Sequence, residues 1–190
     1  MTEITNTLAN AASSILIVID FQAKLIPLIF DGAQVTQRAL LLAQAAKLLK
    51  IPVFGTEQQP LRLGASIPSL AGLYDLSVQK STFDACAEPA FLAALEQLSA
   101  EPARDELCIV GCEAHVCVLQ TVLGLLERGW RVKLVVDAIG SRLESNKLLA
   151  VQRAALHGAE IVSSEMLMFE WLRDSEHPHF REVLKLIKPM

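Results

Sequence analysis

Short runs of apolar, mostly β-branched residues alternate along this chain with longer stretches of helical periodicity. The short runs have the composition of strands buried inside a parallel sheet. They lie at residues 15–19, 52–54, 107–110, 132–136 and 160–162. The helical stretches lie at residues 35–50, 89–98, 115–128, 145–157 and 180–187. This alternation predicts an α/β fold, in which a mainly parallel sheet is covered by helices on both faces.

Length and composition fit one globular domain. The chain has 190 residues, of which 52% are hydrophobic and 20% charged, so it can bury a core and is not disordered. Neither an internal repeat nor a low-complexity linker divides it. We therefore expect a single domain over residues 1–190, with the polar segment 1–13 as a flexible N-terminus.

Charge and cysteine content narrow the partners and the environment. The formal net charge is −4 and lysine and arginine form no run, which argues against binding to nucleic acid or to an anionic membrane. No apolar stretch reaches the roughly 18 residues of a membrane-spanning helix. The first residues lack the features of a secretion signal, and four cysteines in a chain of this length do not resemble a disulfide framework. We expect a reducing, cytoplasmic location.

Polar side chains follow several of the predicted strands. Asp20 ends the first run, Thr56-Glu57-Gln58 follows the second, and residues 113–117 follow the run 107–110. Lys80 lies in the predicted loop before the next helix. Ligands of open α/β sheets bind outside the carboxyl ends of the strands. One rim of the sheet is therefore expected to gather an acid, a base and a thiol.

Each of these three side chains also has a purely structural interpretation. Cys117 begins an apolar helix, where unpaired N–H groups and the helix dipole favour a thiolate, so we expect its pKa to fall well below the roughly 8.5 of a free thiol. The alternative is a buried structural cysteine, which we expect Cys86 and Cys108 to be. Asp20 on its own fits a turn cap, and Lys80 an ordinary surface lysine.

Metal and cofactor sites are not indicated. The spacing Cys108-x3-Cys112-x4-Cys117 contains no CxxC pair, and a strand would direct the first two cysteines to the same face of the core. His177 and His179 fit a solvated loop. No G-x-G-x-x-G sequence follows any strand, so nothing anchors a dinucleotide. We expect neither a metal nor a cofactor.

Three segments together resemble the isochorismatase-like cysteine hydrolases, and within them the branch of isochorismatase domain-containing proteins. They are Ile15-Leu-Ile-Val-Ile-Asp20, Lys80-Ser-Thr-Phe83 and Gly111-Cys-Glu-Ala-His-Val-Cys-Val118. Shorter matches lie at Thr56-Glu-Gln58, Val136-Asp-Ala138, Ser141-Arg142 and His177-Pro-His-Phe180. The resemblance runs from about Ser13 to the C-terminus and rests on the order and spacing of these segments.

The resemblance implies both a fold and a reaction. The fold is a three-layer α/β/α, Rossmann-like domain with a sheet of roughly six strands. The implied reaction is hydrolysis of a small carboxamide through a thioester on Cys117, with Asp20 as base and Lys80 as the third catalytic residue. It also implies a cis peptide between Cys112 and Glu113, and an oxyanion hole formed by the backbone N–H groups of Glu113 and Cys117.

The chain departs from two branches of the family. Nicotinamidases hold a metal through an Asp-x-His pair and a further histidine, whereas residues 52–80 contain no histidine, so nicotinamide is not the expected substrate. True isochorismatases cleave a vinyl ether without a thiol. We expect Phe21, Gln58, Phe83 and His115 to form the walls of a pocket for a small, partly apolar substrate.

Two other functions and one further property remain open from the sequence. The same fold can serve as a non-catalytic binding or scaffolding subunit, and Cys112 with Cys117 can be considered for thiol redox chemistry, although a buried strand cysteine is a poor resolving partner. We expect a homo-oligomer, a dimer or larger. The residues considered for that contact are Trp130, Phe169, Trp171 and Leu172, whose alternative role is to close the core.

Overall fold

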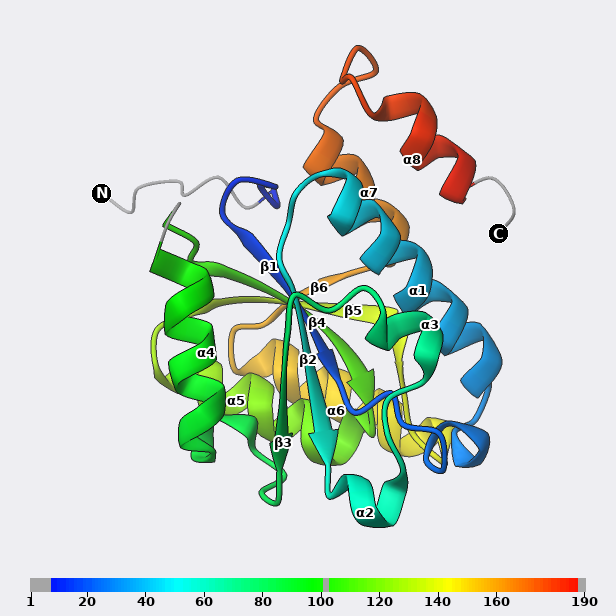
Figure 1. The fold of residues 1–190 in the computed structure, drawn as a ribbon, viewed down its shortest axis with the longest axis vertical. Coiled ribbons are helices and arrows are strands. Elements are labelled where there is room, and N and C mark those ends of the chain that lie inside the picture. The colour runs from blue at the N-terminus through cyan, green and yellow to red at the C-terminus, as the bar shows by residue number, and fades with distance from the viewer. Residues whose placement is uncertain (1–7, 101–102, 188–190) are drawn as a thin grey trace.

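A six-stranded parallel sheet forms the centre of the molecule (Figure 1). The computed structural model describes residues 8–100 and 103–187. The strands are β1 (Ser14–Ile19), β2 (Val53–Gln58), β3 (Leu76–Lys80), β4 (Glu106–Cys112), β5 (Arg131–Gly140) and β6 (Glu160–Val162). Their order in the sheet is β3-β2-β1-β4-β5-β6. The predicted α/β fold with a mainly parallel sheet is confirmed.

Helices cover both faces of this sheet, and β1 shows how one strand supplies two cores. Leu16 and Val18 pack with α1 (Gly32–Leu48), α7 (Ser164–Leu172) and α8 (Phe180–Ile187). Ile15, Ile17 and Ile19 point the other way, toward α4 (Pro89–Ala100), α5 (Leu119–Glu127) and α6 (Glu144–Leu156). Successive side chains of a strand alternate between faces, so a run that is apolar throughout can be buried on both sides.

One predicted loop is a strand. Lys80, which the sequence predicts in a loop, is the last residue of β3, which lies at the edge of the sheet beside β2. The sequence Leu-Ser-Val-Gln-Lys does not have the composition of a buried strand. As an edge strand, β3 pairs with β2 alone, and the side chains of Ser77 and Gln79 are exposed to solvent. Two short helices, α2 (Pro60–Leu63) and α3 (Pro68–Ala71), lie between β2 and β3.

Part of the expected flexible N-terminus is bound to the domain. The backbone N–H of Ala9 donates to Glu170 Oε2 at 2.7 Å, and Arg173 donates to the carbonyl of Ala9 at 2.8 Å. Arg104 donates to the carbonyls of Ala11 and Ser14. Residues 8–13 are therefore held against the fold, while residues 1–7 of that segment lie outside the described residues.

Two of the four residues considered for self-association belong to the core. Trp171 and Leu172 are buried in α7, and the Trp171 indole donates to Ser14 Oγ at 3.0 Å. Phe169 remains 41% exposed, and Trp130 is partly buried against the opposite core. The alternative role, closing the core, is the correct one for Trp171 and Leu172.

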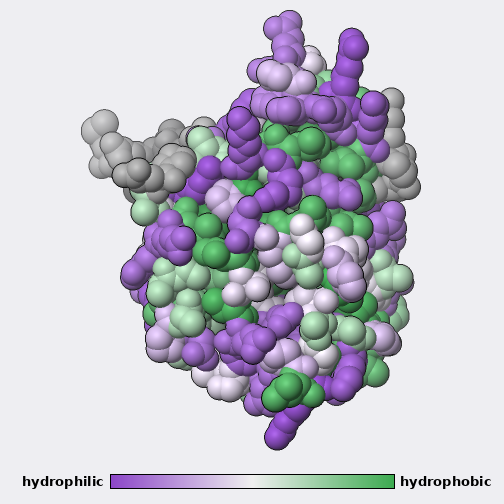
Figure 2. Space-filling view, in the orientation of Figure 1, coloured by the Kyte–Doolittle hydropathy of each residue, from purple (hydrophilic) through white to green (hydrophobic). Residues whose placement is uncertain are grey.

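Within residues 8–100 and 103–187, no helix has both the length and the hydropathy needed to cross a membrane. The face shown in Figure 2 mixes hydrophilic and hydrophobic side chains, and hydrophilic ones are dense at the end that carries α8.

Gly111 is needed where β1 and β4 approach each other, immediately before Asp20. Its φ is +151°, and a Cβ built there would lie 2.5 Å from the Ile19 carbonyl oxygen and 2.6 Å from its Cβ. Backbone cannot yield as a flexible side chain can. We expect Gly111→Ala to lower the free energy of unfolding by about 1–3 kcal/mol beyond the roughly 1 kcal/mol for a positive φ alone, measured by urea denaturation.

A matched control separates the collision from the dihedral angle. Gly129 has φ +83°, and a Cβ added there would meet nothing within 4 Å, so Gly129→Ala carries only the backbone cost. Equal destabilisation by the two substitutions would contradict the close approach of β1 and β4.

Candidate active site

A buried ion pair joins two strands that are not adjacent in the sheet. Asp20 directly follows β1, and Lys80 ends β3. The Lys80 ammonium donates to Asp20 Oδ2 at 2.8 Å, and both side chains are 0% exposed. Removing two charges from water is costly unless they are paired and hydrogen-bonded. Because β2 lies between β1 and β3, the pair is formed across its carboxyl end.

Lys80 has further oxygen acceptors around it. Its Nζ donates to Gln58 Oε1 at 2.7 Å and lies 3.4 Å from the carbonyl oxygen of Thr82. Gln58 is the direct partner of Lys80 in the β2–β3 register, so the two side chains point to the same side of the sheet. The ammonium is thereby held in one position beside Asp20.

Thr56 is expected at the rim as part of Thr56-Glu57-Gln58, but the sequence predicts no role for its own side chain. Its hydroxyl donates to Asp20 Oδ1 at 2.7 Å, and its side chain is buried. The signal was present, since Thr56 lies two positions before Gln58 and the strand alternation places both on one face. What the sequence does not give is which neighbour the hydroxyl reaches.

Cys117 lies in a π-helical turn, Ala114–Val118, between β4 and α5. Its side chain is 6% exposed, and its thiol interacts with both Asp20 and Lys80. The structure therefore brings together Asp20, Lys80 and Cys117 from three distant parts of the sequence. The connection after β4 also carries a cis peptide bond between Cys112 and Glu113.

The expected low pKa of Cys117 is wrong for this resting geometry. Burial of the thiol and the negative charge of Asp20 raise the pKa of Cys117 to about 12, and the positive charge of Lys80 only partly offsets them. The helix terminus, which favours the thiolate, can be expected from the sequence, whereas the carboxylate next to the sulfur, which disfavours it, cannot. At neutral pH the thiol keeps its proton next to a carboxylate that can accept it.

The side chain of Glu113 is fixed at the rim. Arg142 Nε donates to Glu113 Oε1 at 2.8 Å, and Arg142 lies just after β5. The Glu113 carbonyl accepts from the N–H groups of Val116 and Val118 at 3.1 and 3.2 Å. Both the side chain and the carbonyl of Glu113 are thus hydrogen-bonded, which fixes the start of the segment whose N–H groups are predicted to form the oxyanion hole.

The four expected pocket residues lie in three different environments. Gln58 and Phe83, the latter 53% exposed, line an open hollow of about 300 Å³ together with Gln59, Arg62, Leu63 and Ser81. His115 is partly buried, with Nδ1 2.9 Å from Ser141 Oγ and Nε2 3.4 Å from Asn146 Nδ2. Phe21, predicted in the pocket wall, is instead fully buried in the core beside α1.

Cys86, Cys108 and Cys112 are all buried, and none of the four cysteines is in a disulfide. Burial raises the pKa of Cys86 to about 12 and raises the pKa of Cys108 and Cys112 as well. Cys108 and Cys112 lie in the same core cluster, as their strand spacing predicted, whereas Cys117 lies in the cluster on the opposite face. That separation removes support for a Cys112–Cys117 redox pair.

Within the described parts of the chain, no three His, Cys, Asp or Glu side chains are placed to hold a metal ion. His179 contacts Glu182, with Nδ1 2.6 Å from Oε2, three residues farther along.

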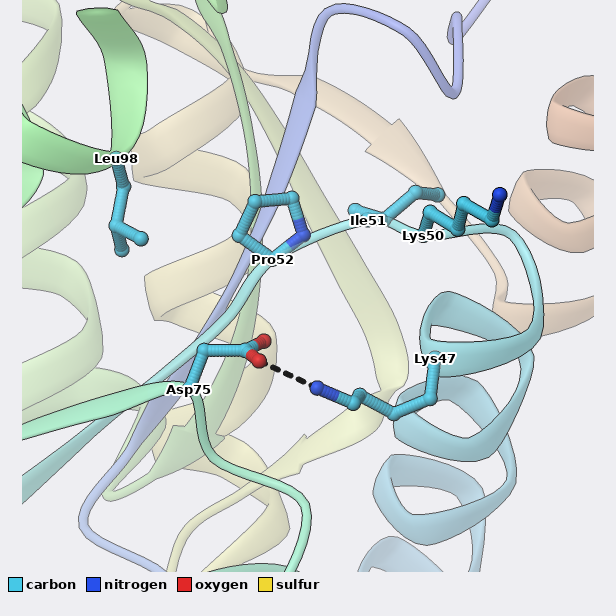
Figure 3. Close-up of a pocket in the computed structure, with 6 residues that line it drawn as sticks. All are labelled: Lys47, Lys50, Ile51, Pro52, Asp75 and Leu98. Carbon is cyan, nitrogen blue, oxygen red and sulfur yellow. Dashed lines mark hydrogen bonds and ion pairs between the residues drawn. The ribbon is translucent and has the colours of Figure 1, made fainter. Parts of the chain in front are cut away.

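A second hollow, of about 450 Å³, lies near the start of β2, at the end of that strand opposite Gln58 (Figure 3). Its lining includes Pro52, Leu98 and an ion pair between Lys47 and Asp75 at 2.5 Å. None of Asp20, Lys80 and Cys117 lines it. The same three side chains are absent from the lining of the hollow at Gln58, but that hollow adjoins the buried polar cluster through Gln58, which accepts from Lys80 Nζ.

Comparison with known proteins identifies one family, that of the isochorismatase domain. Residues 14–166 match the model of the isochorismatase domain. The mouse isochorismatase domain-containing protein 2A is 36% identical over 177 residues, which cover 93% of this chain and 83% of that protein.

Solved structures agree in fold. The Caenorhabditis elegans structure named MAR1 ribonuclease has a TM-score of 0.87 at 35% identity and covers 95% of this chain and 92% of its own. The Escherichia coli YcaC gene product, described as an octameric hydrolase of unknown specificity, has a TM-score of 0.84 at 21% identity, covering 97% and 98%.

Proposed function

Since this chain belongs to the isochorismatase family, we propose that it is a metal-independent cysteine hydrolase that cleaves the C–N bond of a small carboxamide. The observation that carries the proposal is the buried ion pair of Asp20 and Lys80 in contact with the Cys117 thiol. A nucleophile, a proton acceptor and a cation in mutual contact are the groups that acyl transfer requires.

The first step is attack by sulfur on the amide carbonyl carbon. Because burial and Asp20 raise the pKa of Cys117 to about 12, the thiol is neutral at pH 7 and its proton passes to Asp20 as the C–S bond forms. Lys80 remains an ammonium and offsets the charges in the site. Backbone N–H groups of Glu113 and Cys117 are proposed to stabilise the oxyanion of the tetrahedral intermediate.

Collapse of this intermediate breaks the C–N bond. Asp20 returns its proton to the leaving nitrogen, ammonia departs and the acyl group stays on Cys117 as a thioester. Asp20 then takes a proton from water, whose oxygen attacks the thioester, and the same proton returns to the departing sulfur. One amide and one water give one carboxylic acid and one ammonia, and the enzyme is regenerated without any cofactor.

The small hollow lined by Gln58 and Phe83 is the proposed substrate pocket, because Gln58 also accepts from Lys80 Nζ, and His115 is proposed as a further wall residue. We further propose a homo-oligomer in the cytoplasm. Four free cysteines suit a reducing compartment, and the exposed Phe169 remains from the residues considered for self-association.

The test is a panel of small primary carboxamides with ammonia release and intact mass as readouts. We expect at least one amide to release ammonia and to leave an acyl adduct that maps to Cys117. Cys86→Ala, which removes another buried cysteine, should retain both signals, whereas Cys117→Ala should gain no adduct. Ammonia release that persists in Cys117→Ala would remove the nucleophile from the proposal.

Two competing functions give different results in the same experiment. A non-catalytic binding subunit would turn over no amide and would leave no acyl adduct on Cys117. If this chain had the ribonuclease activity in the name of the Caenorhabditis elegans protein, it would cleave RNA added to the panel. A chain with a net charge of −4 and no run of basic residues offers little attraction for a polyanion.

A further inference from the structure

The strand between Asp20 and Lys80 contacts both of them through alternate residues. In β2, Thr56 donates from Oγ1 to Asp20 Oδ1 at 2.7 Å, while Gln58 Oε1 accepts from Lys80 Nζ at 2.7 Å. Residues two apart in a strand project to the same face. One short segment thus hydrogen-bonds both charged groups of the ion pair.

Thr56 contacts Asp20 in two ways. Besides the hydroxyl hydrogen bond, the Thr56 carbonyl accepts from the Asp20 N–H at 3.2 Å. Asp20 has φ +54°, an unusual angle outside glycine, and the backbone bond from Thr56 holds this turn in place. The Thr56 side chain is fully buried, so no water competes for its hydroxyl at the surface.

A hydroxyl that donates to a carboxylate favours the ionised form of that carboxylate. Ionised Asp20 is the form that accepts the proton of Cys117 in the proposed mechanism. Lys80 from β3 favours the same form by its positive charge. The other titratable groups that sense the charge of Asp20 are Cys117 after β4, Cys112 in β4, and Tyr74 between α3 and β3.

We propose that Thr56 is a positioning residue that holds the Asp20 carboxylate in the orientation from which it accepts the Cys117 proton. The inference rests on the proposed hydrolase function. It assigns to β2 a role in the chemistry beyond carrying the pocket residue Gln58, because the Thr56 hydroxyl binds the carboxylate oxygen that Lys80 does not.

The experiment compares Thr56→Val, which keeps the shape and removes the hydroxyl, with Thr56→Ser, which keeps the hydroxyl. Thr121→Val is the matched control, because Thr121 Oγ1 is also buried and hydrogen-bonded, but to the N–H of Ala85. Two pH profiles are recorded for each protein: kcat/KM for an amide of the panel, and alkylation of Cys117 by iodoacetamide.

We expect the acid limb of both profiles to move to higher pH in Thr56→Val by about one to two pH units, the size of a hydrogen bond to a charged group. Thr56→Ser and Thr121→Val should keep the limb of the unmodified protein, even where Thr121→Val melts at a lower temperature. Should Thr56→Val fail to fold, Thr56→Ala provides the same comparison.

The outcomes separate the inference from the function on which it rests. If the alkylation limb moves and no amide is hydrolysed, the proposed function fails while the role of Thr56 stands. If amides are hydrolysed and neither limb moves in Thr56→Val, or if Thr121→Val moves both limbs equally, the role of Thr56 is overturned.

Discussion

Replacing Asp20 by asparagine is expected to slow amide hydrolysis by about 10²–10⁴-fold, the usual contribution of a positioned proton acceptor and donor. The same substitution should lower the pKa of Cys117. A negative charge beside the thiol disfavours a second anion, and removing it leaves the attraction of Lys80 acting against burial alone. More thiolate and less turnover in one variant would show that the site uses proton transfer rather than a preformed thiolate.

The measurement pairs steady-state hydrolysis with the pH titration of thiolate absorbance, taken as the difference from a Cys117→Ala background. Asp137→Asn is the control. Asp137 also lies toward the carboxyl end of its strand, and it accepts from the Ser164 N–H and hydroxyl at 2.7 and 2.6 Å. That variant loses local hydrogen bonds but should leave the Cys117 titration unchanged. A Cys117 pKa that rises or stays constant in Asp20→Asn would contradict the contact between carboxylate and thiol.

Asp20 and Cys117 could be placed from the sequence because the physics that places them is local. A run that is apolar throughout is a buried strand, and the first polar residue after it must emerge at the carboxyl end. Cys117 follows its strand by a short connection in the same way. Lys80 is expected at the same rim but in a loop, since the edge strand that carries it has little apolar character, and its catalytic role comes only from the family resemblance.

Phe21 shows where local rules fail. Ile15, Ile17 and Ile19 face the core on the Cys117 side, so continued alternation would direct Phe21 there too. The left-handed backbone of Asp20, with φ +54°, breaks the alternation, and Phe21 packs instead with Leu16 and Val18. A positive φ at a residue other than glycine is rare, and nothing in the run before it signals one.

The ionisation of Cys117 depends on contacts that only the folded chain creates. The helix terminus that favours a thiolate is visible in the sequence, whereas burial of the sulfur and its approach to Asp20 are not. Both of these raise the pKa of Cys117, and together they outweigh the positive charge of Lys80. The direction of the pKa shift of Cys117 is therefore set by tertiary contacts. Because the thiol stays protonated at rest, the proposed mechanism transfers its proton to Asp20 as the sulfur attacks.

Lys80→Met is expected to lower the free energy of unfolding by about 3–5 kcal/mol, because it leaves the Asp20 carboxylate buried without its cation. Thr56 still donates to Asp20 Oδ1, but one hydroxyl cannot replace a charge. Urea denaturation measures the loss. The control is Lys47→Met, which breaks a pair with Asp75 whose side chains are 40% and 38% exposed and which should lose no more than about 1 kcal/mol.

The double variant Asp20→Asn/Lys80→Met tests whether the buried ion pair contributes to stability or to the chemistry of Cys117. With both charges gone, neither a buried ion nor its desolvation remains, so most of the stability lost in Lys80→Met should return. Activity should not return, since the proton acceptor is absent. A double variant as unstable as Lys80→Met would show that the pair itself holds the strands together, whereas a stable, inactive one would show that β1 and β3 carry these charges for the chemistry of Cys117.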